Sequence, residues 1–257
     1  MADVRVQGMH AAVVHDGVQD EVAVEEPLEI AVDGRPLAVT MRTPGHDEEL
    51  AAGFLHGEGL IDGAPRFVPD PALAANRVVV AGPLRRDPAA RHFYTTSSCG
   101  VCGKGALEEV AVQAAPASPG PRVPRRLLAT LPERLRQPGF ARTGGLHATG
   151  LFDAGGRLLL AREDVGRHNA MDKVVGRMLL DGVLPLAGRL LCVSGRLSFE
   201  LVQKAAVAGA PVLVGVGAPT SLAVSLAADR AMTLCGFARD GRVNVYTGDE
   251  RVLDDPA

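Results

Sequence analysis

The second half of the chain alternates short apolar runs with helical patterns, and this alternation is the feature that most constrains its fold. The apolar runs at 190–193 and 212–214 read as buried strands, and helical patterns follow at 199–208 and 221–227. Strands and helices that alternate at this spacing are typical of α/β units with a parallel or mixed sheet. We therefore expect an α/β fold.

Three turns in this half combine small and polar residues directly after an apolar strand. They lie at 162–169, 194–198 and 215–221. Each places backbone N–H groups and hydroxyls at the carboxyl end of a strand, where open α/β sheets bind phosphates and nucleotides. Together they predict a large anionic ligand, although a salt-bridged helix start explains the residues of 162–169 equally well.

Hairpins and a helix are predicted on either side of the chain's middle. Alternating residues from Glu25 to Met41 turn at Asp33-Gly34, and the runs 151–153 and 158–160 flank a second glycine turn. Such turns between strand patterns predict hairpins. Residues 46–56 read as a helix with an acidic first turn, which the helix dipole favours.

We expect three segments along the chain. Residues 1–21 carry no clear period and read as a loose lead-in, and 22–141 form an N-terminal part with hairpin, helix and cysteine loop. Residues 142–257 form the C-terminal α/β part. The arginines of 122–136 are expected on a solvated helix face rather than in a docking patch for an acidic partner.

Two of the four cysteines stand as Cys99-x-x-Cys102 between a strand pattern and a helix pattern. A helix N-terminus and the nearby Lys104 both lower a thiol's pKa and raise the fraction of the reactive thiolate. A buried structural pair, a zinc site, a redox pair and a persulfide carrier all fit this spacing. Zinc needs further ligands, whereas Cys192 and Cys235 each stand alone in an apolar run and are expected in the core.

A partial zinc deaminase signature precedes these cysteines. In that signature, His-x-Glu is followed by Pro-Cys-x-x-Cys, and the histidine and both cysteines bind zinc. Here His46-Asp47-Glu48 supplies the first half, but Ser98 stands where the proline belongs. Acidic residues that open a helix also have a simple capping explanation, so we expect no metal.

Charge and composition narrow the classes of protein further. The chain of 257 residues has a net charge of −3, which argues against a nucleic-acid or anionic-membrane surface. No apolar run approaches the roughly 20 residues of a membrane span, and the first residues do not read as a signal peptide. We expect a cytoplasmic protein, in which cysteines are more often catalytic or metal-binding than disulfide-bonded.

Seven segments taken together resemble the formate dehydrogenase accessory sulfurtransferase family, from about residue 22 to Tyr246. They are EEPLEI (25–30), VTMRTPGHDEELAAGF (39–54), TTSSCGVCGK (95–104), TGGLH (143–147), REDVGRHNAMDKVVG (162–176), SGRLSFELVQKAA (194–206) and GAPTSLAVSLA (217–227). The resemblance implies a sulfurtransferase that carries persulfide sulfur from a cysteine desulfurase to the molybdenum or tungsten of bis-molybdopterin guanine dinucleotide. Formate dehydrogenase then receives that cofactor.

The resemblance also implies a cytidine deaminase-like three-layer domain with a smaller appended α+β lobe, and a homodimer. Cys99 matches the persulfide-bearing cysteine, and Cys102 matches its companion. The stretch that matches the cofactor-binding segment comprises Phe237, Ala238, Arg239, Asp240, Gly241 and Arg242. An aromatic ring and two arginines suit a base and its phosphates, although Asp240-Gly241 also fits a plain hairpin. A cofactor-binding chaperone without sulfur chemistry and a zinc-dependent deaminase are the alternatives.

Overall fold

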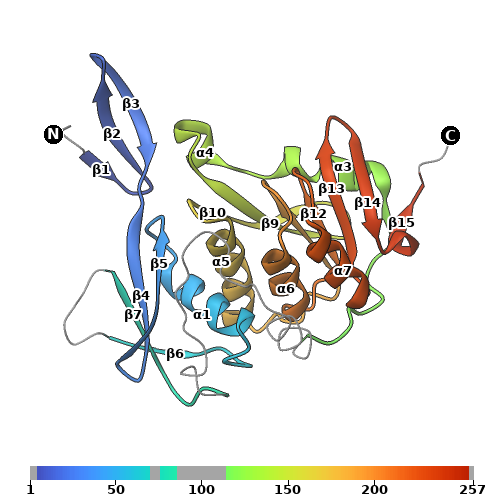
Figure 1. Cartoon of the computed structure of the whole chain (residues 1–257), viewed down its shortest axis with the longest axis horizontal. Helices are drawn as coiled ribbons and strands as arrows, with labels where there is room; N and C mark the ends of the chain where they lie inside the picture. Colours follow the sequence, from blue (N-terminus) through green and yellow to red (C-terminus); the bar gives the residue numbers. More distant parts are fainter. Residues whose placement is uncertain (1–4, 70–75, 86–113, 255–257) are drawn as a thin grey trace.

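A computed structural model describes residues 5–69, 76–85 and 114–254. The Cys99-x-x-Cys102 segment therefore lies outside the described residues. Within them the chain forms an α/β structure with a large lobe, a small lobe and a separate N-terminal sheet (Figure 1). The predicted mixture of helices and strands in one α/β protein is confirmed.

The large lobe is built on a six-stranded mixed sheet in the order β10-β9-β11-β12-β13-β14. Its strands are β9 (His147–Asp153), β10 (Leu158–Asp164), β11 (Arg189–Val193), β12 (Val212–Gly215), β13 (Thr233–Arg239) and β14 (Arg242–Thr247). The three central strands β11, β12 and β13 are parallel, whereas β9 and β14 run antiparallel to their neighbours. The predicted hairpin around Gly155-Gly156 is the β9–β10 pair.

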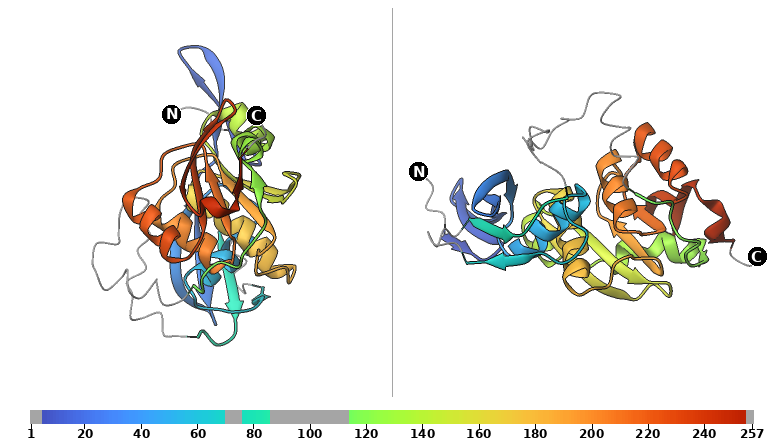
Figure 2. Two further views of the ribbon diagram at one scale, coloured as in Figure 1. Left: turned by 90° about the vertical axis from the view of Figure 1, so that its right-hand side faces the viewer. Right: turned by 90° about the horizontal axis from the view of Figure 1, so that it is seen from below.

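Helices cover both faces of this sheet, because the side chains of each strand alternate between two cores. On one face α5 (Arg167–Leu180), α6 (Phe199–Val207) and α7 (Ser221–Asp229) pack on residues such as Leu191 and Leu213. On the other face α3 (Arg125–Arg134) packs on Leu190 and Val212. Figure 2 shows the sheet between these layers.

Cys192 and Cys235 both lie in the core beneath α3, as the sequence predicted. Burial raises the pKa of both thiols, that of Cys235 to about 12. A thiol with so high a pKa is protonated at neutral pH, so neither of these cysteines is a reactive nucleophile.

The small lobe joins a four-stranded sheet to one helix. The sheet has the order β5-β4-β7-β6, from β4 (Glu26–Val32), β5 (Arg35–Arg42), β6 (Arg66–Val68) and β7 (Arg77–Ala81). The turn between β4 and β5 has positive φ angles of 48° at Asp33 and 78° at Gly34, which confirms the predicted hairpin. Helix α1 (Asp47–Gly57) follows, within one residue of its predicted start and end.

Two glycines let α1 lie directly against α5 of the large lobe. A Cβ atom on Gly53 would fall 1.9 Å from the carbonyl oxygen of Asp172, and one on Gly176 would fall 1.8 Å from that of Glu49. These distances lie far inside van der Waals contact, so only glycine fits at either place. The close crossing of α1 and α5 holds the two lobes together.

Residues 1–21 were expected to be a loose lead-in, and this prediction is wrong where the structure describes them. An antiparallel sheet of β1 (Arg5–Gln7), β2 (His10–His15) and β3 (Val18–Ala23) extends from the small lobe (Figure 1). Val14 and Val18 are more than half exposed, so the strands lack the buried alternating face that makes a strand visible in a sequence.

Four short elements complete the large lobe. Helix α4 (Pro138–Thr143) precedes β9, and β8 (Val123–Pro124) pairs in parallel with β15 (Val252–Leu253) after a 3₁₀ turn at Asp249–Arg251.

In the described part of the chain, no helix is both long and apolar enough to cross a membrane.

Candidate functional site

The three predicted turns meet at one edge of the large sheet. Because β9 runs antiparallel to both β10 and β11, strands β10, β11 and β12 all point the same way and end together. The turns after β11 and β12 are bonded directly, since the Gly217 amide donates to the Gly195 carbonyl at 3.0 Å and the Leu197 amide to the Ala218 carbonyl at 3.0 Å. We call this region, with residues 147, 165–168, 194–198, 216–220 and 237, the sheet edge.

Two helices begin at the sheet edge with capped N-termini. The hydroxyl of Ser198 accepts from the Leu201 amide at 3.4 Å, and that of Thr220 accepts from the Ala223 amide at 3.3 Å. Helix α5 begins at the same edge after Gly166, without a side-chain cap. Several helix N-termini that converge on one place favour a bound anion there, because their partial positive charges add.

Basic side chains gather around the same point. Burial lowers the pKa of His147, and the nearby Arg167, His168 and Arg196 lower it further. His147 is therefore neutral at neutral pH beside two permanent cations. The Nε atom of Arg167 is buried and has no hydrogen-bond partner among the described residues. A buried donor without a partner is costly, and an anionic group at this place would satisfy it.

The segment 237–242 is the end of the β13–β14 hairpin, and its first residue touches the sheet edge. The Phe237 amide donates to the Gly217 carbonyl at 3.2 Å, and 39% of Phe237 is exposed. The turn has φ angles of 51° at Asp240 and 70° at Gly241, so the hairpin that these two residues predicted is present. Within the described ranges neither Arg239 nor Arg242 has an ion-pair partner, which leaves both guanidinium groups open to solvent.

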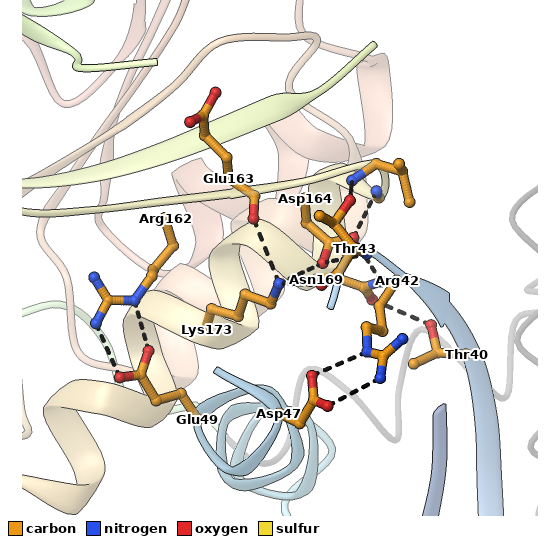
Figure 3. A network of polar contacts seen from close by, with 12 residues as sticks. Thr40, Arg42, Thr43, Asp47, Glu49, Arg162, Glu163, Asp164, Asn169 and Lys173 are labelled. Atoms are coloured by element: carbon orange, nitrogen blue, oxygen red, sulfur yellow. Dashed lines mark hydrogen bonds and ion pairs between the residues drawn. The ribbon is translucent and has the colours of Figure 1, made fainter. Parts of the chain in front are cut away.

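The segment 162–169 divides into structural and accessible residues. Figure 3 shows Arg162 pointing to Glu49 and Lys173 pointing to Asp164. The Arg162–Glu49 pair has distances of 2.7 and 2.9 Å. Asp164 is fully buried and lies 2.7 Å from the Lys173 ammonium. For these residues the salt-bridged interpretation is correct.

Arg167 and His168, by contrast, line a cavity of about 500 Å³ between the lobes. His168 Nε2 lies 2.7 Å from a carboxylate oxygen of Glu200 and 3.2 Å from the Ser198 hydroxyl. Deeper in the cavity wall, Lys204 donates to Asp172 at 2.7 Å. The sequence analysis did not identify this pair, and the only signal for it was a charged residue on the apolar face of each of two helices.

Burial raises the pKa of Asp172 to about 6. Burial is the largest single influence on Lys204 and acts against its charge, but the carboxylates of Asp172, Glu58 and Glu200 together outweigh it, so the pKa of Lys204 is raised. Both groups are therefore charged at neutral pH, and the pair is a buried ion pair in the wall of the cavity.

The residues of the partial deaminase signature have structural roles. His46 stands at the N-cap position of α1 with a φ of 60° and lies 3.4 Å from the Glu49 carboxylate, and Asp47 accepts two hydrogen bonds from Arg42 at 3.0 Å each. Among the described residues no three His, Cys, Asp or Glu side chains are close enough to hold a metal ion. The two cysteines of the signature lie outside the described residues.

Comparison with known proteins decides the family. The model of the FdhD/NarQ family matches residues 23–253, which is most of the chain. The chain belongs to the FdhD/NarQ family. This family is the one that the seven sequence segments resembled, so that prediction is confirmed.

Two curated relatives of the FdhD/NarQ chain from Streptomyces carry the same name. Proteins named sulfur carrier protein FdhD from Streptomyces avermitilis and Streptomyces coelicolor are 49% and 50% identical to it over 251 and 252 residues. Each alignment covers 91% of this chain and 89% of the relative.

The fold also matches a solved structure, described as a formate dehydrogenase accessory protein from Desulfotalea psychrophila. That structure is 28% identical to this chain, with a TM-score of 0.75, and the match covers 98% of this chain and 99% of the other. The FdhD/NarQ match includes both the cysteine segment and the 237–242 hairpin.

Proposed function

We propose that this FdhD/NarQ chain is a sulfurtransferase that supplies sulfur for formate dehydrogenase. The observation that carries the proposal is the Cys99-x-x-Cys102 segment in a chain whose curated relatives, nearly half identical to it, are named sulfur carriers. The kinship with a formate dehydrogenase accessory protein supports the choice of client.

Cys99 accepts the sulfur in this proposal, with Cys102 as its companion. A persulfide on the donor, a cysteine desulfurase, is attacked at its terminal sulfur by the Cys99 thiolate. The S–S bond of the donor breaks, a new S–S bond forms on Cys99, and the donor leaves as a thiolate. The step requires Cys99 to be a thiolate, which Lys104 and the helix start predicted from the sequence after the cysteines favour.

The substrate that receives the sulfur is the Mo/W bis-molybdopterin guanine dinucleotide, which we place at the sheet edge. Its negative phosphates suit Arg167 and Arg196 and the N-termini of α6 and α7. The guanine base suits the exposed ring of Phe237, and Arg239 and Arg242 lie at the hairpin end beyond it. We assign cofactor binding to all six residues from Phe237 to Arg242, as the resemblance implies.

A cytidine deaminase-like arrangement of the large lobe, a homodimer and a cytoplasmic location belong to the same proposal. A mixed sheet with helices on both faces supports the first of these. No structural metal is required, since a persulfide carrier needs its sulfur free for exchange.

The second candidate function is a cofactor-binding chaperone without sulfur chemistry. The sheet edge favours it, because the edge accounts for anion binding without any cysteine. Maturation of formate dehydrogenase with Cys99→Ala distinguishes the two. The sulfurtransferase proposal predicts an enzyme that contains cofactor and is inactive, whereas a fully active enzyme would favour the chaperone. One zinc per chain, lost in Cys102→Ala, would favour the deaminase instead.

A further inference from the structure

Strand β10 is an edge strand of the large sheet, and part of its outer side is open. Its single neighbour in the sheet is β9. A second cavity, of about 550 Å³, is lined by every residue from Leu158 to Glu163. Successive residues of a strand point to opposite faces of the sheet, so a cavity that touches all of them runs along the strand's edge.

The hydrogen-bond register shows which backbone groups face this cavity. In β9, the Ala148 amide and carbonyl both bond to Ser194, on the side away from β10. Glu163 is opposite Ala148 in the register, so its backbone groups point outward. Ala161 is two residues earlier and points the same way.

The acceptors on this outer edge are already bonded, whereas the donors are unpaired among the described residues. The Ala161 carbonyl accepts from Arg162 at 3.0 Å, and the Glu163 carbonyl accepts from Lys173 at 3.4 Å. The amides of Ala161 and Glu163 have no partner among the described residues. The edge therefore offers two N–H donors spaced as in a β-ladder.

Among the described residues that line the cavity, Arg136 supplies an unpaired positive charge, whereas burial lowers the pKa of His46 and keeps it neutral at neutral pH. Arg136, Arg162 and His46 line it, and Arg136 has no ion-pair partner in the part of the chain that the structure describes. Arg162 is paired with Glu49, and His46 Nδ1 lies 3.4 Å from the same carboxylate. The one carboxylate in the lining, that of Glu163, accepts from the Gly139 and Phe140 amides at 2.9 and 2.7 Å and is thereby satisfied.

We propose that the outer edge of β10 is a docking strand for an extended, carboxylate-bearing segment of a protein partner. Backbone carbonyls of that segment accept from Ala161 and Glu163, as in strand addition to a sheet edge. A carboxylate side chain of the segment pairs with Arg136, and apolar side chains pack on Leu158 and Leu159. This partner surface runs along the outer side of β10. It is separate from the sheet edge at the carboxyl ends of β10, β11 and β12, and the proposal does not depend on the proposed sulfur chemistry.

Two peptide probes test the chemistry of the site. They are capped eight-residue peptides of alternating valine with glutamate and of alternating valine with lysine, titrated into the full chain by calorimetry at low salt. The glutamate peptide is expected to bind, at least tenfold more tightly than the lysine peptide. Equal affinity for both peptides, or no binding of either, would overturn the proposal.

Two variants with matched controls test the position. Ala161→Pro removes an outward amide that β9 does not use, and proline is tolerated where an edge N–H faces solvent. It is expected to weaken glutamate-peptide binding roughly two- to tenfold, whereas Ala161→Val, which keeps the amide, retains binding. Arg136→Glu is expected to weaken binding by roughly fivefold or more. Arg66→Glu, at an exposed arginine of the edge strand β6, should change nothing.

A second copy of the chain is the competing occupant of this edge. Sedimentation analysis of wild type and Ala161→Pro decides between a partner segment and a second copy of the chain. An unchanged oligomeric state with weakened peptide binding supports the proposal. Conversion of a wild-type dimer to a monomer by Ala161→Pro would assign the edge to self-association and overturn it. Binding that survives both Ala161→Pro and Arg136→Glu would also overturn it.

Discussion

Replacing Lys173 by methionine should destabilise the protein far more than any exposed charge change. Lys173 lies 2.7 Å from the Asp164 carboxylate and donates to the Thr43 carbonyl at 2.9 Å, with about 1% of its side chain exposed. It thus joins α5, the end of β10 and the loop before α1. Methionine fills a similar volume but leaves the Asp164 carboxylate buried without a counter-ion.

Loss of one partner from a buried ion pair costs about 3–5 kcal/mol of unfolding free energy. For a chain of this size, that corresponds to a fall in melting temperature of roughly 6–20 °C. The Asp164 carboxylate keeps hydrogen bonds from the Thr43 and Gly166 amides at 3.1 and 2.8 Å. We therefore expect a loss of unfolding free energy at the lower end of this range.

Arg177→Met is the matched control on the same helix. Arg177 pairs with Asp181 at 2.8 Å and lies 3.9 Å from Glu49, which keeps its closer partner Arg162, and 46% of the Arg177 side chain is exposed, so its loss should cost about 0.5 kcal/mol. Urea unfolding followed by circular dichroism measures both variants. The double change Asp164→Asn with Lys173→Met should recover part of the loss, because no unpaired charge remains. If Lys173→Met stays within 1 kcal/mol of wild type, the account of this network is wrong.

Three further predictions concern packing, pH dependence and the cofactor site. Gly176→Ala should cost at least about 1–3 kcal/mol, because its Cβ would fall 1.8 Å from the Glu49 carbonyl oxygen, whereas Gly63→Ala, with nothing within 4 Å, should be neutral in thermal unfolding. The pKa of Asp172 is raised from 3.8 to about 6, so the folded state binds a proton first as the pH falls. From pH 7 to pH 5, wild type should therefore gain about 1 kcal/mol relative to Asp172→Asn, and a gap in unfolding free energy that does not change with pH would refute this. Arg242→Ala should weaken GDP binding about tenfold in calorimetry, and ADP should bind wild type more weakly than GDP; equal affinities in all combinations would remove 237–242 from the site.

Much of the fold was visible in the sequence because its signals are local. Asp33-Gly34 specifies a turn regardless of where the hairpin lies in the fold. From β11 to α7, strands and helices alternate and are joined by turns of small residues. The N-terminal sheet was missed because exposed valines on both sides of β2 and β3 leave no buried face to produce a period.

The site was predicted only in part, because convergence depends on strand order. The turns at 162–169, 194–198 and 215–221 were identified from their residues, but nothing local shows that His147 lies beside them. Likewise, Lys173 and Thr43 are 130 residues apart in sequence, and only the crossing of α1 with α5 brings them together. The roles of Cys99 and Cys102 stay predictions.

Mass spectrometry of the chain after incubation with a cysteine desulfurase and ³⁵S-labelled L-cysteine tests the proposed sulfur carriage most directly. We predict one additional labelled sulfur atom on the peptide that contains Cys99, released by a reductant and absent from Cys99→Ala. A chain that takes up no label, or label that persists in Cys99→Ala, would contradict the account.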